Sequence, residues 1–301
     1  MNLTLERQPE NPYQLKPTRL LQYELGPKLA WYGAPKENPL VSQQDLASIF
    51  FFFKKQLGPE TINPLLEKIL AAGPEKLSRI SCGLASLISL VKSFSLDQNW
   101  PKSVGQYDAP RIIADLTQLH GSSALNPLTR QPLDQGWLAF ANADQAIEQW
   151  SIYHHALAHE IEQLSDNKLT TFGLKKFDQK SLRKILQSGA KVIVSVDNSM
   201  IAADRFKSNR DLNQGTHLVS LLGASPKGAW LLLADPYVEK FSRADSLNEA
   251  AAKPDWIKAK KLFGFLKPQD QRFAVAAVLK ENANDFAEQF KELTYPLARP
   301  S

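Results

Sequence analysis

Residues 215–237, GTHLVSLLGASPKGAWLLLADPY, contain the pattern that decides the fold of this chain. Two apolar runs, 217–222 and 230–234, flank a segment in which Pro226 and Gly228 favour a reversal of the chain. We therefore predict a β-hairpin with His217 at the start of its first strand and Asp235 at the end of its second. Antiparallel pairing would bring these two side chains to the same edge of a sheet.

Further short runs on both sides of the hairpin have the apolar and β-branched character of strands. They lie at 169–172, 192–196, 262–266 and 273–278, and a helix is predicted between the first two at 181–187. The first half of the chain instead has helical periodicity. Its predicted helices are 42–57, 61–72, 81–94, 109–119 and 143–164. This segregation predicts an α+β fold with a helical half and an antiparallel sheet built mainly from the C-terminal half.

The chain is expected to divide near residue 75. Several prolines before residue 40 indicate an extended arm, which two predicted helices follow. We assign residues 1–75 to an N-terminal arm and helical extension, and residues 76–301 to the main domain. No internal repeat is found.

The only cysteine, Cys82, falls at the predicted start of the helix 81–94. That helix is apolar nearly all round and is expected to be buried. Unpaired N–H groups and the dipole at a helix N-terminus favour a thiolate. A carboxylate at Asp235 that holds one nitrogen of His217, with the other nitrogen facing the thiol, is the arrangement that activates Cys–His nucleophiles. The alternative for Cys82 is a small buried apolar residue.

Two motifs carry a resemblance to known enzymes. The run SCGLASL, residues 81–87, resembles the active-site helix of the papain-like cysteine peptidases, and its CGLAS part is most similar to phytochelatin synthases. The His217 strand and the Asp235 hairpin resemble both those enzymes and the bacteriocin-leader peptidases of peptide-exporting ABC transporters. The resemblance covers residues 76–280. It implies a papain-like fold in which Cys82 is the nucleophile, His217 the general base and acid, and Asp235 its orienting residue.

The activity that this resemblance implies is that of a cysteine peptidase or amide hydrolase. It would act on a peptide or protein substrate through an acyl-enzyme, with no cofactor and no metal. Hydrolysis is one outcome, and γ-glutamyl peptide transfer of the phytochelatin synthase type is another. Transglutaminase-like acyl transfer, with its Cys, His and Asp in the same order, is a third.

One position departs from the family pattern. Both relatives carry an oxyanion-hole glutamine six residues before the cysteine, where this chain has Lys76. Loss of an oxyanion donor costs about a hundredfold to a thousandfold in rate. A catalytically inactive papain-like binding protein is therefore a further alternative, with the Phe50–Phe53 cluster as a candidate contact surface. The long spacing from Cys82 to His217 also predicts an inserted segment within 120–165.

Other polar groups receive simpler interpretations. His154, His155 and His159 include a metal-like i, i+4 pair, but their order is not that of the metalloprotease motif, and we interpret them as a polar helix face. The polar loop 197–213 is either a gate over the cleft or a plain excursion.

Composition limits the partners. Lys and Arg exceed Asp and Glu by 36 to 31, and the excess is spread along the chain, so no nucleic-acid partner is expected. The apolar runs are far shorter than the roughly 18 residues of a spanning helix, so no membrane insertion is expected. The polar N-terminus has no signal-peptide pattern, which predicts a cytoplasmic protein or one exported without a cleavable signal.

Overall fold

A seven-stranded sheet is the centre of the structure. The computed structural model describes residues 82–101, 154–175, 177–197, 216–236, 254–266 and 274–297. Within these ranges the strand order is β5-β4-β3-β2-β6-β1-β7, and every neighbouring pair is antiparallel. The strands are β1 (Leu169–Leu174), β2 (Lys191–Asp197), β3 (Thr216–Ala224), β4 (Trp230–Ala234), β5 (Asp255–Lys258), β6 (Ala274–Leu279) and β7 (Thr294–Pro296). The expected α+β class with an antiparallel sheet is confirmed.

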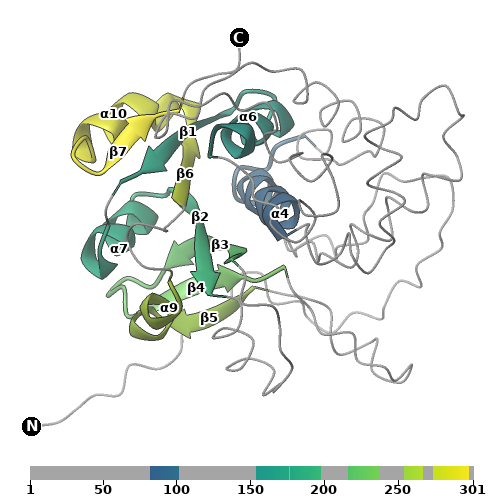
Figure 1. Ribbon diagram of the computed structural model, residues 1–301. Coiled ribbons are helices and arrows are strands. Elements are labelled where there is room, and N and C mark those ends of the chain that lie inside the picture. Colours follow the sequence, from purple (N-terminus) through teal and green to yellow (C-terminus); the bar gives the residue numbers. More distant parts are fainter. Residues whose placement is uncertain are drawn as a thin grey trace, which may run out of the picture.

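Helices cover both faces of this sheet (Figure 1). One face carries α4 and α6, which contact β2 and β3 and also β1 and β6. The other face carries α7, α9 and α10, which share one apolar core with the sheet. The helices are α4 (Cys82–Asp97), α6 (His154–Leu164), α7 (Gln179–Gln187), α9 (Ala259–Phe265) and α10 (Ala283–Gln289), and a 3-10 turn, η5 (Lys280–Asn282), precedes the last.

The central strand β2 shows why its segment of the sequence, 192–196, is apolar almost throughout and does not alternate with polar residues. Val192, Val194 and Val196 point into the core beneath α7 and α9. The residues between them face α4, and Lys191 reaches Asp97 at the end of that helix. A strand covered on both faces needs side chains that can be buried on both, so its sequence is a continuous apolar run.

No helix in the described ranges is long and apolar enough to cross a bilayer.

The predicted hairpin is confirmed as β3 and β4. Ser220 lies opposite Ala234, and a bulge shifts the register between Leu221 and Gly223. The turn closes with a hydrogen bond from Gly228 N to Ser225 O of 2.7 Å. Gly228 has a φ of 68°, a conformation that favours glycine, so this turn depends on that residue.

Most other predicted elements within the described ranges are confirmed, but one is wrong. The helix 81–94 is α4, and the helix 181–187 is α7, whose N-terminus is closed by a capping box between Asp178 and Ser181. Of the run 262–266, predicted as a strand, residues 262–265 belong to helix α9 instead, and Leu266 forms an isolated β-bridge with Val196. The buried residues of α9 are Ala259, Leu262 and Phe265, a spacing of three that belongs to one helical face. A short apolar run alone does not distinguish the two structures.

Several predictions concern residues outside the described ranges. These are the arm and extension 1–75, the helix 109–119, most of the insertion 120–165, the loop 197–213 beyond its first residue, Lys76 and the Phe50–Phe53 cluster. Of the helix predicted at 143–164, α6 accounts for the described part.

Candidate active site

The candidate nucleophile is the first residue of α4. Cys82 begins a 16-residue helix whose first turn contains no acidic side chain. Its leading backbone N–H groups have no intrahelical acceptors, and the positive end of the helix dipole lies there. The helix is buried because its apolar residues pack on the sheet and against α6. As a result Cys82 is itself only 8% exposed.

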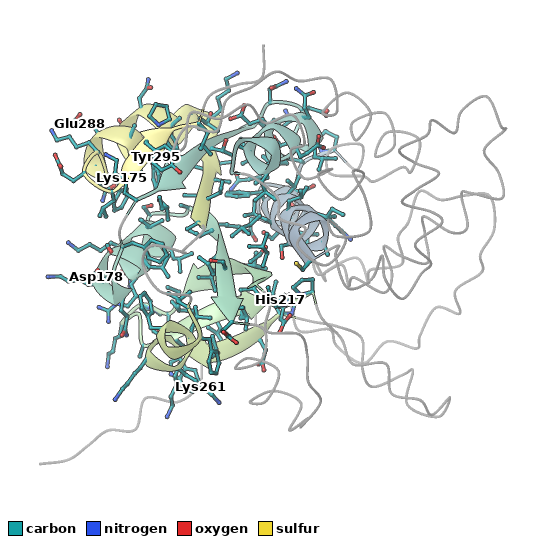
Figure 2. The ribbon with its side chains drawn as sticks, in the orientation of Figure 1. Lys175, Asp178, His217, Lys261, Glu288 and Tyr295 are labelled. Atoms are coloured by element: carbon teal, nitrogen blue, oxygen red, sulfur yellow. The ribbon has the colours of Figure 1, made fainter. Side chains whose placement is uncertain are left out.

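The candidate base and its orienting carboxylate are joined by the hairpin. His217 Nε2 lies 2.8 Å from Asp235 Oδ1, and both side chains are almost fully buried. The register of β3 and β4 explains this contact, because the pair Ser220 and Ala234 places the start of one strand beside the end of the other. Figure 2 shows His217, at the start of β3, near α4. The two residues predicted at one sheet edge are thus brought together.

The electrostatics link Cys82 to this pair. Burial is the largest single influence on the pKa of His217 and lowers it. The charge of Asp235 and its hydrogen bond oppose burial, and a hydrogen bond and charge interaction with Cys82 add to them, so the pKa of His217 is raised to about 10. At neutral pH the ring is therefore an imidazolium between a carboxylate and a sulfur. The structure brings all three predicted site residues into one cluster.

Two buried serines beside this cluster received no role in the sequence analysis, although Ser86 belongs to the CGLAS run. Ser86 Oγ donates to Leu218 O at 2.9 Å, and Ser220 Oγ donates to Ser86 O at 2.7 Å. Both serines are fully buried between α4 and β3. The available signal is that each interrupts an apolar run, Ser86 in a helix and Ser220 in a strand.

A second polar cluster lies at the other end of α4. The amine of Lys191 is buried and donates to Ser93 Oγ at 2.7 Å and to Asp97 Oδ2 at 2.5 Å, above the ring of Phe94. Burial lowers the pKa of Lys191 to about 8, although Asp97 acts in the opposite direction. Because helix rise is 1.5 Å per residue, this end lies roughly 22 Å from Cys82.

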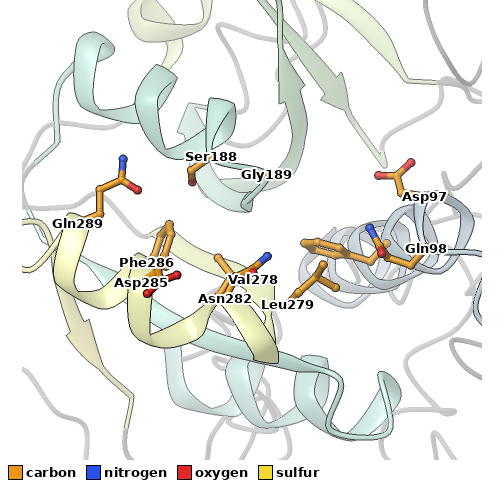
Figure 3. A pocket seen from close by; sticks show the side chains of 11 residues that line it. Asp97, Gln98, Ser188, Gly189, Val278, Leu279, Asn282, Asp285, Phe286 and Gln289 are labelled. Carbon is orange, nitrogen blue, oxygen red and sulfur yellow. The ribbon is translucent and has the colours of Figure 1, made fainter.

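A cavity of about 430 Å³ opens at this same end of the helix (Figure 3). Phe94 and Asp97 of α4 line it, with Gln98 just after that helix. On the other side it is lined by Asn282 of η5 and by Asp285 and Phe286 of α10. It is therefore separate from the cluster of Cys82, His217 and Asp235.

No metal site is found in the described part of the chain, where no group of three or more His, Cys, Asp or Glu side chains has a suitable arrangement. The histidines 154, 155 and 159 lie on α6, and their side chains fall outside the part that is described.

Comparison with known proteins adds no relative. No model of a protein family matches this sequence, and no curated protein matches it. Its function must be inferred from the cluster and from the motifs around it.

Proposed function

We propose that this protein is a papain-like cysteine peptidase or amide hydrolase that works through an acyl-enzyme on Cys82. The observation that supports this most is the 2.8 Å contact between His217 and Asp235. The same imidazole also interacts with Cys82, which lies at the start of a buried helix. Cys82 begins helix α4, His217 lies in β3, and Asp235 directly follows β4. A nucleophile, a base and an orienter held within hydrogen-bond reach are the requirement for this chemistry.

Each residue has a separate role. Asp235 holds Nε2 of His217, so the opposite ring nitrogen, Nδ1, is the one that exchanges a proton with the thiol. The buried carboxylate stabilises the imidazolium, and the imidazolium stabilises the thiolate. The absence of an acidic side chain in the first turn of α4 leaves the helix dipole available to the sulfur.

The reaction then follows from proton positions. Cys82 Sγ forms a bond to the carbonyl carbon of the substrate, and the carbonyl π electrons move to its oxygen. When the C–N bond breaks, His217 gives its proton to the leaving nitrogen. Water next loses a proton to His217 and attacks the thioester, and breakage of the C–S bond releases the acid. An amine in place of water would give acyl transfer.

The developing oxyanion needs donors within the site. The backbone N–H of Cys82 is suited to this, because the first N–H groups of a helix have no intrahelical partner. Such a donor contributes about a hundredfold to a thousandfold in rate.

A papain-like binding protein without catalysis is the competing proposal. The 8% exposure of Cys82 favours it, because a substrate carbonyl must reach the sulfur. The cavity at the far end of α4 favours it as well, since it lies away from the thiol.

Alkylation of the single cysteine tests the two proposals. The full chain is treated with iodoacetamide at pH of about 5.5 and about 7.5, and the adduct is measured by mass spectrometry, with Cys82→Ala as the blank. Hydrolytic function predicts modification at both pH values, and loss of the reaction at the lower pH in His217→Gln. Modification only in urea would refute the enzyme and favour the binding protein. Peptide profiling of wild type against Cys82→Ala would then distinguish hydrolysis from transfer.

A further inference from the structure

Two hydrogen bonds join the helix that carries the thiol to the strand that carries the imidazole. Ser86 Oγ donates to Leu218 O at 2.9 Å, and Ser220 Oγ donates to Ser86 O at 2.7 Å. Each serine side chain thus bonds to the backbone of the other element. Both lie in the interior, where water does not compete for these bonds.

The bonds lie close to the reacting groups along both chains. Ser86 is four residues after Cys82, which places it on the same face of α4, one turn further on. Leu218 is the residue next to His217, and Ser220 is three residues after it. A small slide or rotation of α4 on the sheet would therefore change the distance from sulfur to imidazole directly.

Ser86 differs from Ser89 and Ser93 of the same helix in the acceptor that its hydroxyl uses. Ser89 Oγ donates to Ala85 O at 2.7 Å, and Ser93 Oγ donates to Leu90 O at 2.7 Å, so both hydroxyl protons stay within the helix. Ser93 Oγ also accepts a bond from Lys191 of β2. Donation within the helix is the usual choice for a helical serine. Ser86 donates to the strand instead, so its hydroxyl fixes the helix to the sheet.

We infer that Ser86 and Ser220 are positioning residues that hold Cys82 and His217 at reacting distance. The inference rests on the proposed function of the cluster. Apolar packing is non-directional and permits small shifts, whereas a hydrogen bond has a preferred length and angle. A misplacement of about 1 Å costs on the order of a hundredfold in rate.

The test compares Ser86→Ala and Ser220→Ala with Ser89→Ala, which removes a buried hydroxyl that donates to Ala85 O of its own helix. Iodoacetamide alkylation of Cys82 is measured across pH in the full chain. We expect the first two variants to react at least tenfold more slowly near pH 5.5, with a flattened pH profile. Ser89→Ala should keep the wild-type pH profile. Ser220→Thr retains the hydroxyl that Ser220→Ala removes, so it should react with the wild-type rate and pH profile.

A second readout separates this inference from the proposed function. The midpoint of His217 titration is followed by NMR of the ring protons, with Cys82→Ala as the reference for loss of the sulfur contact. Positioning predicts that both serine variants shift the midpoint toward that of Cys82→Ala. If they titrate as wild type does, the inference is wrong even where Cys82 is reactive. If wild-type Cys82 fails to react, the proposed function fails, and the NMR shift still decides the role of the serines.

Discussion

The carboxylate of Asp235 is the group whose removal most directly tests the charge state of the cluster. Asp235→Asn keeps the shape of the side chain and removes its charge. In the wild type, burial lowers the pKa of His217 but Asp235, with help from Cys82, raises it to about 10. The two largest raising influences both come from Asp235. The pKa of His217 should therefore be far lower in Asp235→Asn than in the wild type.

The size of the effect follows from the two pKa values. At pH 8 a ring with a pKa of about 10 is about 99% protonated, whereas a return to the ordinary 6.5 leaves about 3%. Because the pKa is raised on folding, the stabilising contribution is complete below about pH 6.5 and is lost as pH rises to about 10. Within that window the free energy of unfolding falls by about 1.4 kcal/mol per pH unit.

Two measurements check this prediction. NMR titration gives the His217 midpoint, assigned by its disappearance in His217→Gln, and urea unfolding at several pH values between 6.5 and 10 gives the slope. The slope should be compared as a difference between wild type and variant, because Lys191, whose pKa is lowered to about 8, adds an opposite slope above that pH in both proteins. Asp255→Asn, at an exposed carboxylate, is the matched control. An unchanged midpoint in Asp235→Asn would refute the reasoning.

Three further outcomes are expected. Cys82→Ala should lower turnover of any peptide substrate by at least about a thousandfold, as other nucleophile deletions do, with no comparable change in a protein that carries Ser89→Ala. Lys191→Met should leave the free energy of unfolding at pH 7 unchanged or higher in urea titration, because burial already opposes the charged amine; a loss of about 3 kcal/mol or more would contradict this. Gly173→Ala should lower the melting temperature and reduce the free energy of unfolding by about 1–3 kcal/mol. The reason is that the added Cβ would lie 2.2 Å from the Tyr295 ring across the β1–β7 pair. An unchanged melting curve would show that the ring moves aside.

The hairpin was predictable because its signals are local. Apolar runs separated by Pro226 and Gly228 determine where the chain turns, and pairing then brings His217 and Asp235 to one edge. The position of Cys82 at a helix start was predictable for the same reason. That the sulfur faces the imidazole was predicted from the chemistry of Cys–His nucleophiles and from the family resemblance, not from local signals, since two segments far apart in sequence must pack in one particular register.

The polar contacts of α4 were missed because the helix was judged by its overall apolar character. Its residues Cys82, Ser86, Ser93 and Asp97 are spaced by four, seven and four, which is one stripe along a helix. Such a stripe on a buried helix predicts polar contacts with whatever it packs on. The partners, Leu218, Ser220 and Lys191, are set by the sheet register and could not be read from the helix.

This stripe gives the two ends of α4 opposite chemistry. The N-terminal end, where backbone N–H groups favour negative charge, carries the thiol of Cys82. The C-terminal end, where carbonyls favour positive charge, receives the ammonium of Lys191 from β2. Between them Ser86 and Ser93 each bond to the sheet. Because both ends are held by polar contacts with β2 and β3, α4 cannot slide toward either end without breaking one of them, and the sulfur keeps its place beside His217.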